Sequence, residues 1–299
     1  MLLALDVGNT HTVVGLFDPD TVGPGGDREG EGRGDAGPAG GSRRWRCSPE
    51  EVPGLKFHWR VATASDRTSD EHALLLVELL RLAHVEVGGD GLGDSVSGMA
   101  ISSSVPSATA ALREMVQRWF PVPTVVIEPG VRTGMPILYD NPKEVGADRI
   151  ANAIGALDLF SPPLIIVDLG TATTFDVISA AGEYLGGAIA PGIEISTNAL
   201  FAEAAALRRV ELVEPRHVIG KSTVESIQSG VIYGNAALVD GVCRRIMEDL
   251  GPATVIATGG LAPLVRPLSE VVQHHEPWLT LHGLRLIFSR NVERPSSPS

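Results

Sequence analysis

An apolar run, an Asp-x-Gly turn and a second apolar run occur in this order twice in a chain of 299 residues. The first copy is MLLALDVGNTHTVVGLFD at residues 1–18, and the second is LIIVDLGTATTFDVI at residues 164–178. Short β-prone runs joined by a turn that contains Gly or Asn are typical of a hairpin. Because the pattern recurs once, about half a chain apart, it indicates two duplicated domains rather than a short-period repeat. The aligned pairs are Asp6 and Asp168, Gly8 and Gly170, and Thr12 and Thr174.

The turn of the first hairpin combines a carboxylate, a glycine and several hydroxyl or amide side chains. Gly8 lets a ligand approach the backbone without meeting a Cβ atom. Backbone N–H groups of such a turn can bind phosphate oxygens, while Asp6 can hold a hydrated metal ion. The turn therefore predicts a polyphosphate site, and a plain turn capped by Asp6 is the alternative.

Composition narrows the class of protein. The length favours two domains with real cores, and the formal charge of −12 argues against a nucleic-acid partner, which would recruit a basic surface. The two cysteines, Cys47 and Cys243, stand in unlike contexts and suggest reduced thiols. The N-terminus lacks a basic region and no apolar run has membrane-span length. We therefore expect a cytoplasmic protein with no membrane partner.

Strands and helices alternate along the chain. Apolar runs predict strands at residues 56–63, 97–103, 124–128, 164–168, 173–179, 183–190 and 254–258. Helical spacing predicts helices at residues 73–85, 106–120, 146–157, 194–207 and 222–248. The segments Thr68–Glu71 and Ser222–Glu225 match the capping box that begins a helix. This order predicts an α/β protein with mixed sheets flanked by helices, divided into domains at residues 1–157 and 158–299.

Residues 19–54 interrupt this pattern. The segment is rich in Gly, Pro and charged residues and has almost nothing to bury, so it predicts a flexible inserted loop. A phosphate-binding Gly-rich loop is the less favoured alternative, because no strand leads directly into a helix there. Residues 292–299 are expected to form a frayed tail, and His274 and His275 a solvated pair.

Further motifs follow the two hairpins in order. These are Tyr139, GADR at 146–149, DLGTATT at 168–174, GGAIAPG at 186–192, GKST at 220–223 and ATGG at 257–260. Through them the chain resembles the type III pantothenate kinases, within the sugar kinase, Hsp70 and actin superfamily. The resemblance implies two ribonuclease H-like domains with ATP in the cleft between them. It also implies ATP-dependent phosphorylation of the primary hydroxyl of pantothenate, the first step of coenzyme A biosynthesis.

The requirements of that reaction can be matched to residue types. A pantothenate kinase needs an acceptor for the hydroxyl proton, a cation for the substrate carboxylate, and metal and backbone donors for ATP. Asp148 fits the first need, because a loose transition state acidifies the alcohol late and a weak base suffices. Arg149 fits the second, because its planar fork binds a carboxylate at two points. The alternatives are that Asp148 caps the helix and pairs with Arg149, and that Arg149 forms a surface ion pair.

The resemblance also implies a set of site residues. The expected substrate-binding residues are Tyr139, Gly146, Ala147, Asp148, Arg149 and Thr223, and Tyr139 could instead belong to the core. The expected ATP-binding residues are Asp6, Val7, Gly8, Asn9, Thr10, His11, Thr12, Val13 and Thr171. Asp6 would lie near the Mg²⁺ that accompanies ATP. Asp168 would bind a monovalent cation, potassium or ammonium, with a Mg²⁺-water contact or plain turn capping as alternatives.

The last expectations concern the oligomeric state of the protein and the adenosine side of the ATP site. The resemblance implies a homodimer in which Thr223 reaches the pantothenate of the partner subunit. Gly259 and Gly260 would admit the adenosine, although a plain strand-to-helix turn is the alternative.

A nucleotide-binding regulatory protein on the same fold, or a hydrolase that uses water, would also need the hairpins. The GADR run, Tyr139 and Thr223 argue for an acceptor site and against the regulator.

Overall fold

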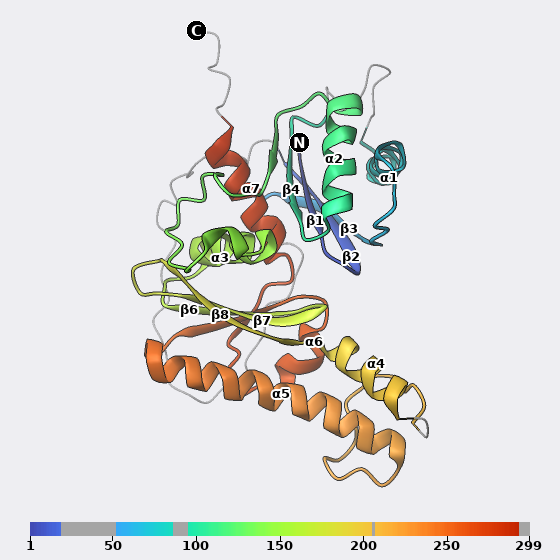
Figure 1. The fold of residues 1–299 in the computed structure, drawn as a ribbon, viewed down its shortest axis with the longest axis vertical. Helices are drawn as coiled ribbons and strands as arrows, with labels where there is room; N and C mark the ends of the chain where they lie inside the picture. Colours follow the sequence, from blue (N-terminus) through green and yellow to red (C-terminus); the bar gives the residue numbers. More distant parts are fainter. Residues whose placement is uncertain (19–51, 86–94, 205–206, 293–299) are drawn as a thin grey trace.

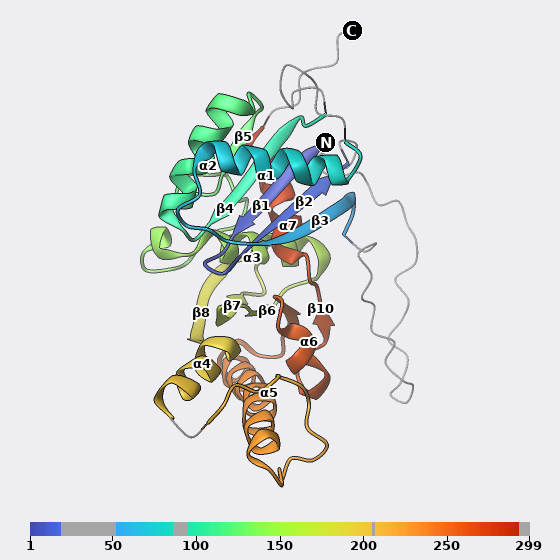
Figure 2. The ribbon, with the colours of Figure 1, turned by 90° about the vertical axis from the view of Figure 1, so that its right-hand side faces the viewer.

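The computed structural model describes residues 1–18, 52–85, 95–204 and 207–292, which form two five-stranded mixed sheets flanked by helices (Figure 1 and Figure 2). The strand order of the first sheet is β3 (Leu55–Ala62), β2 (His11–Phe17), β1 (Leu2–Val7), β4 (Gly98–Ser103) and β5 (Thr124–Val126). The strand order of the second is β8 (Tyr184–Pro191), β7 (Ala172–Ile178), β6 (Leu164–Leu169), β9 (Thr254–Thr258) and β10 (His274–His275). The predicted α/β fold with mixed sheets is confirmed.

Both sheets are built on the repeated hairpin. In the first, β1 pairs antiparallel with β2 and parallel with β4. In the second, β6 pairs antiparallel with β7 and parallel with β9. Asp6 and Asp168 therefore occupy equivalent positions near the carboxyl ends of β1 and β6, opposite Val13 and Thr174. The repeat found in the sequence therefore corresponds to a repeated strand topology in the two sheets.

Helices α1 (Ser69–Leu82) and α2 (Pro106–Trp119) cover one face of the first sheet. The capping box predicted for α1 is present, because Glu71 N–H donates to Thr68 Oγ1 and Thr68 N–H donates to the Glu71 carboxylate. This helix ends at Leu82, before the predicted residue 85. The core beneath both helices contains Leu3, Leu5, Leu16, Leu80, Met99 and Ile101. Full burial of one such side chain stabilises the fold by about 1.5–3 kcal/mol.

Helices α3 (Ala147–Leu159) and α7 (Leu279–Asn291) pack against each other and join the two sheets through one core. Two glycines allow the helices to approach closely. A Cβ atom on Gly283 would lie 1.8 Å from the Ala151 carbonyl oxygen, and one on Gly155 would lie 2.6 Å from that of Leu279. The sequence reading did not predict α7, which packs on β1 and β4 of the first sheet although it comes late in the chain. The domain division at residues 157/158 stays a prediction.

Helices α4 (Ile193–Glu203), α5 (Thr223–Leu250) and α6 (Ala262–Val265) lie on the second sheet (Figure 1). Helix α4 ends before the predicted residue 207. The predicted capping box of α5 is half present. Glu225 N–H donates to Ser222 Oγ, but the Glu225 carboxylate accepts from Lys221 N–H instead of the cap residue. Within the described ranges, no helix combines the length and apolar composition needed to cross a bilayer.

Three further predictions concern the insertion, the C-terminal tail and the histidine pair. Of the predicted insertion, residues 19–51 lie outside the described residues, whereas Val52 is buried in the core that joins the sheets. The predicted tail likewise falls outside the described residues from 293 onward. The solvated His274–His275 pair is wrong, because both residues form β10 and His275 is buried. Parallel pairing with β9 draws this short segment into the sheet edge.

Candidate active site

The turn between β1 and β2 presents its polar groups at one edge of the first sheet. Gly8 N–H donates to the His11 carbonyl oxygen at 3.0 Å, and the Asn9 amide donates to Ser104 Oγ at 3.4 Å. Asn9 and Thr10 are exposed. Other members of the predicted ATP-binding run, Val7 and Thr12, are buried, and Thr12 Oγ1 bonds Thr63 Oγ1 at 2.8 Å. Val13 is partly buried against the core. The groups open to a ligand are therefore those at the tip of the turn.

The turn of the second hairpin meets the first. Thr10 Oγ1 lies 3.0 Å from Thr171 Oγ1, within hydrogen-bond distance. Gly170 N–H donates to the Ala172 carbonyl oxygen at 3.0 Å, which repeats the geometry at Gly8. Gly259, with φ of +88°, closes against this turn, and a Cβ atom there would lie 2.4 Å from Asp168 Oδ1. Glycine is required at this position by both its backbone angle and the lack of space.

Three carboxylates from separate elements influence one another at this junction. Asp6 is the penultimate residue of β1, Asp168 is the penultimate residue of β6, and Asp148 lies in the first turn of α3. Burial and the negative charges of Asp148 and Asp168 raise the pKa of Asp6 to about 8. Burial and the charge of Asp148 raise the pKa of Asp168 to about 7. A cation between these groups would relieve the repulsion and favour their ionised forms.

The described residues contain no cluster of three His, Cys, Asp or Glu side chains that could ligate one metal together. A metal ion at this junction would thus take part of its coordination from phosphate or water oxygens. This fits the expected indirect role of Asp6, since Mg²⁺ keeps several of its waters when it binds with nucleotide phosphates.

A buried amide positions Asp168. The Asn152 Nδ2 group donates to Asp168 Oδ2 at 3.0 Å, and Thr280 Oγ1 donates to Asn152 Oδ1 at 2.7 Å. Asn152 is fully buried on α3, and Thr280 comes from α7. Sequence reasoning missed both residues. A usable signal was the spacing of Asn152, four residues after Asp148 and hence on the same face of the helix.

Arg149 is held in a buried network. Its Nε donates to Asp176 Oδ1 at 2.7 Å, and the Tyr184 hydroxyl donates to the same oxygen at 2.7 Å. Asp176 is fully buried and Arg149 is 8% exposed, so the surface ion pair considered for Arg149 is wrong. The Nη2 atom of Arg149 is buried without a hydrogen-bond partner among the described residues. That unused donor could bind an anionic group of a ligand.

The start of α3 fixes the position of Asp148. Its Oδ1 accepts from the Arg149 backbone N–H at 2.8 Å, which is the capping contact considered as an alternative. The side-chain pair with Arg149 is not formed, because that guanidinium bonds Asp176. A Cβ atom on Gly146 would lie 2.5 Å from Asp148 Oδ1, so glycine leaves room for the carboxylate. The neighbouring Ala147 is partly buried.

Tyr139 lies beside the Arg149 network. Its ring centroid is 6.4 Å from that of Tyr184, and a Cβ atom on Gly186 would lie 3.2 Å from its ring. Gly186 has φ of +120°, so the backbone conformation and the aromatic contact both favour glycine. Tyr139 is partly buried and packs against the core, as the structural alternative for it predicted. Through Tyr184 it borders the Arg149 network, and its role in binding substrate stays a prediction.

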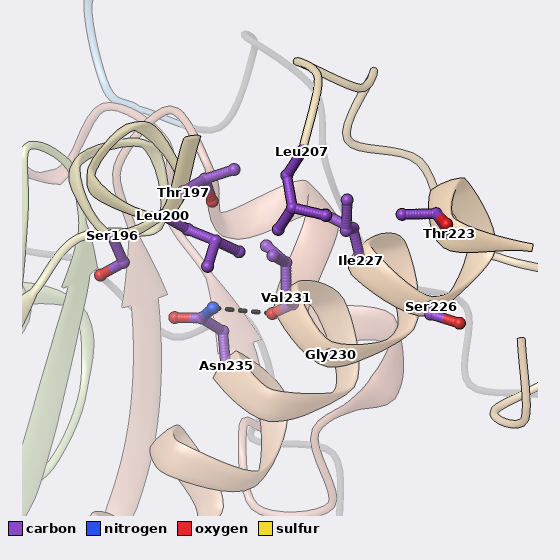
Figure 3. A pocket seen from close by; sticks show the side chains of 10 residues that line it. All are labelled: Ser196, Thr197, Leu200, Leu207, Thr223, Ser226, Ile227, Gly230, Val231 and Asn235. Atoms are coloured by element: carbon purple, nitrogen blue, oxygen red, sulfur yellow. Dashed lines mark hydrogen bonds between the residues drawn. The ribbon is translucent and has the colours of Figure 1, made fainter. Parts of the chain in front are cut away.

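Thr223 stands apart from the other predicted site residues. It is exposed in the first turn of α5. Helix α5 lies across the second sheet from α3 in Figure 1. It borders a pocket of ≈ 480 Å³ between α4 and α5 (Figure 3). The pocket is lined by Ser196, Thr197, Leu200, Leu207, Thr223, Ser226, Ile227, Gly230, Val231 and Asn235. Within one chain, Thr223 is not brought to Asp148 and Arg149.

Comparison with solved structures supports the fold. The chain is similar to (R)-2-hydroxyglutaryl-CoA dehydratase component A of Acidaminococcus fermentans, with a TM-score of 0.52 and 14% identity over 96% of each chain. It is also similar to the activator of the 2-hydroxyisocaproyl-CoA dehydratase from Clostridium difficile with bound ADPNP, with a TM-score of 0.53 and 10% identity over 99% of each chain. At these identities the likeness concerns the fold alone.

Comparison of sequences identifies the family. A family model described as type III pantothenate kinase matches residues 47–245. The chain is 50% identical over 299 residues to a type III pantothenate kinase of Streptomyces coelicolor, covering 98% of this chain and 100% of the relative. It is 49% identical over 294 residues to one of Acidothermus cellulolyticus, covering 98% and 99%. With the resemblance thus confirmed, the chain belongs to the type III pantothenate kinases, the enzymes that phosphorylate pantothenate with ATP.

Proposed function

We propose that the junction of the two hairpin turns and α3 is the active site of this reaction, which yields 4′-phosphopantothenate for coenzyme A biosynthesis. The observation that carries the proposal is the contact of the two hairpin turns with each other and with α3, which brings Asp6, Asp148 and Asp168 within electrostatic range of one another. Such a group serves phosphoryl transfer, which relies on metal binding, positioning and one proton acceptor.

In this proposal the ATP phosphates lie between the two turns. Asn9, Thr10 and Thr171 supply polar side chains there. Asp6 would hold Mg²⁺ through water molecules, and the ion would supply charge neutralisation at the phosphates. The role of the chain itself is to fix the phosphates in line with the acceptor, a contribution that can account for several kcal/mol of the barrier, about 7–11 in the best cases.

Asp148 and Arg149 act on pantothenate. Asp148 accepts the proton of the primary hydroxyl as the bond to phosphorus forms. Arg149 binds the pantothenate carboxylate through the nitrogen atoms that Asp176 does not occupy. Asp176 and Tyr184 hold the guanidinium in one orientation, and Tyr139 packs along the substrate. Gly146 leaves room for the Asp148 carboxylate, and Ala147 is expected to lie beside the substrate.

Asp168 is proposed to bind a monovalent cation. Its carboxylate is fixed by Asn152 and lies against Gly259. A large, weakly hydrated ion such as potassium or ammonium suits one carboxylate with carbonyls, and it can dock phosphate where no P-loop lysine exists. The Mg²⁺-water contact and plain turn capping are the alternatives that the next experiment separates.

We expect turnover to be far faster in potassium or ammonium buffer than in sodium buffer, because sodium is smaller and more strongly hydrated. Initial rates of ADP release at constant ionic strength test this. Asp168→Asn should lower the activity and remove most of the difference between the ions, since it removes the proposed ligand. Equal wild-type rates in sodium and potassium would show that Asp168 serves Mg²⁺ or the turn alone.

The proposed assembly is a homodimer in the cytoplasm. Thr223 is remote from Asp148 within one chain, so its expected contact with pantothenate requires a second subunit. Exposed apolar side chains on and near α4 and α5 include Ile189, Ile195, Leu200, Val218, Ile219 and Val224. A two-fold axis through this surface would bury them and bring Thr223 to the partner's site.

A further inference from the structure

Arg60 is an arginine on the edge strand β3 that none of the assignments above uses. It pairs in register with Val13 of β2, and its side chain is exposed. Its Nη2 atom lies 3.0 Å from Nδ1 of His11, the residue where the phosphate turn ends and β2 begins. The guanidinium is thereby held at the turn proposed to surround the phosphates.

The same guanidinium contacts the second unit. A Cβ atom on Gly260 would lie 2.2 Å from Arg60 Nη1 and 2.9 Å from its Cζ, so the group rests directly on the Gly260 backbone. Gly260 follows Gly259, the glycine packed against Asp168. Arg60 therefore spans the junction, with the turn of the first hairpin on one side and the turn after β9 on the other.

Among the described residues, no carboxylate forms an ion pair with Arg60. In the part of the chain that the structure describes, the arginines with ion pairs include Arg81, Arg113, Arg118, Arg149 and Arg244. Arg60 is not among them, and its hydrogen-bond partner is a neutral imidazole. Burial and then the charge of Arg60 lower the pKa of His11, while Glu194 opposes the shift. Neither a neutral histidine nor a glycine backbone compensates the positive charge of the guanidinium. The arrangement is therefore suited to binding an anionic ligand.

The charge of the site points in the same direction. Asp6, Asp148 and Asp168 place three carboxylates at the junction, and Arg149 is already paired with Asp176. The MgATP complex is itself an anion. Besides Mg²⁺ and the monovalent ion proposed at Asp168, a cationic side chain that faces the phosphates would further offset the repulsion between the nucleotide phosphates and these carboxylates.

We propose that Arg60 binds the phosphates of ATP, as a nucleotide-binding residue that bridges the two sides of the active site. The planar guanidinium matches phosphate oxygens in a two-point contact, and its place between His11 and Gly260 lies between the phosphate turn and the expected adenosine side. The inference rests on the proposed location of ATP between the hairpin turns.

The test measures MgATP binding by calorimetry in wild type and in Arg60→Gln. Loss of a charge-assisted contact should weaken MgATP roughly ten- to a hundredfold. Competition by adenosine, which lacks phosphate, and the affinity for pantothenate should stay unchanged. Arg81→Gln is the matched control, because Arg81 is an exposed arginine on α1, and it should bind MgATP like wild type. Arg60→Lys should be intermediate, since it keeps the charge and loses the fork.

Two results would overturn the inference. If Arg60→Gln binds MgATP within about twofold of wild type, a change well below the smallest expected effect, Arg60 does not contact the phosphates. If adenosine weakens as much as MgATP, the side chain acts on the base. If Arg60→Gln has a lowered melting temperature, the MgATP affinity of Arg60→Lys tests the same contact. Failure of the proposed site has a separate signature, because Asp6→Asn would then leave MgATP affinity unchanged whatever Arg60 does.

Discussion

Asp148→Asn should remove nearly all turnover and leave the fold and both substrate affinities largely intact. The asparagine Oδ1 can still accept the Arg149 backbone N–H, so the start of α3 keeps its contact. What is lost is the acceptor for the hydroxyl proton, and general-base contributions of this kind are about 10²–10⁴-fold in rate. The measurements are kcat from ADP release and dissociation constants for pantothenate and MgATP from calorimetry.

The control for this variant is Asp249→Asn, which removes a carboxylate from the exposed end of α5. It should turn over at the wild-type rate. An Asp148→Asn enzyme that keeps most of the wild-type rate would remove Asp148 from the mechanism. Equal losses of kcat and of pantothenate affinity would instead make Asp148 a binding residue.

Co-expression of two inactive chains should restore activity if the site is shared between subunits. Asp148→Asn lacks the base, and Thr223→Arg blocks the partner's pantothenate with a bulky side chain. With random pairing half of the dimers are mixed and each has one intact site, which gives up to roughly a quarter of wild-type activity. Separate tags on the two chains allow the mixed dimer to be purified and assayed.

The single variant Thr223→Val supports the same test. Loss of a hydroxyl that bonds a charged substrate costs about 1.5–3 kcal/mol, which is roughly ten- to a hundredfold in pantothenate affinity, with little effect on ATP. Mixed dimers that form and stay inactive would show that Thr223 serves its own subunit. A monomeric enzyme with full activity would contradict the shared site altogether.

The repeated hairpin shows what sequence could establish. An Asp at the end of an apolar run, a glycine turn and a second apolar run were enough to place Asp6 and Asp168 at equivalent ends of β1 and β6. Strand β9 and the start of α1 were also located, because a buried strand and a capping box are local signals. Elements predicted from local patterns of this kind are present in the folded structure.

Helix α7 shows why other parts of the fold could not be predicted from the sequence. Its pattern is interrupted by Gly283 and by His282 and Arg285, which are buried although they are polar. His282 is satisfied by Asp158 of α3 at 2.8 Å, a partner 124 residues earlier in the chain. Long-range partners decide whether a polar residue can be buried, and no local period reveals them.

For the same reason, the sequence analysis did not identify four residues of the proposed site. Asp176 and Asn152 hold Arg149 and Asp168 from other elements, and Thr280 acts through Asn152. Arg60 meets Gly260 only after the two sheets have come together. An Asp inside the apolar strand β7 was a usable sign, because a buried charge needs a partner.

The most direct test of the central claim is ADP release by the purified chain with MgATP in potassium buffer, measured with and without pantothenate. The proposed site predicts ADP release that depends on pantothenate and matches the 4′-phosphopantothenate formed, mole for mole. Equal release without pantothenate would indicate a hydrolase that uses water as acceptor. Nucleotide binding with no ADP release under either condition would indicate a regulatory protein and contradict the account.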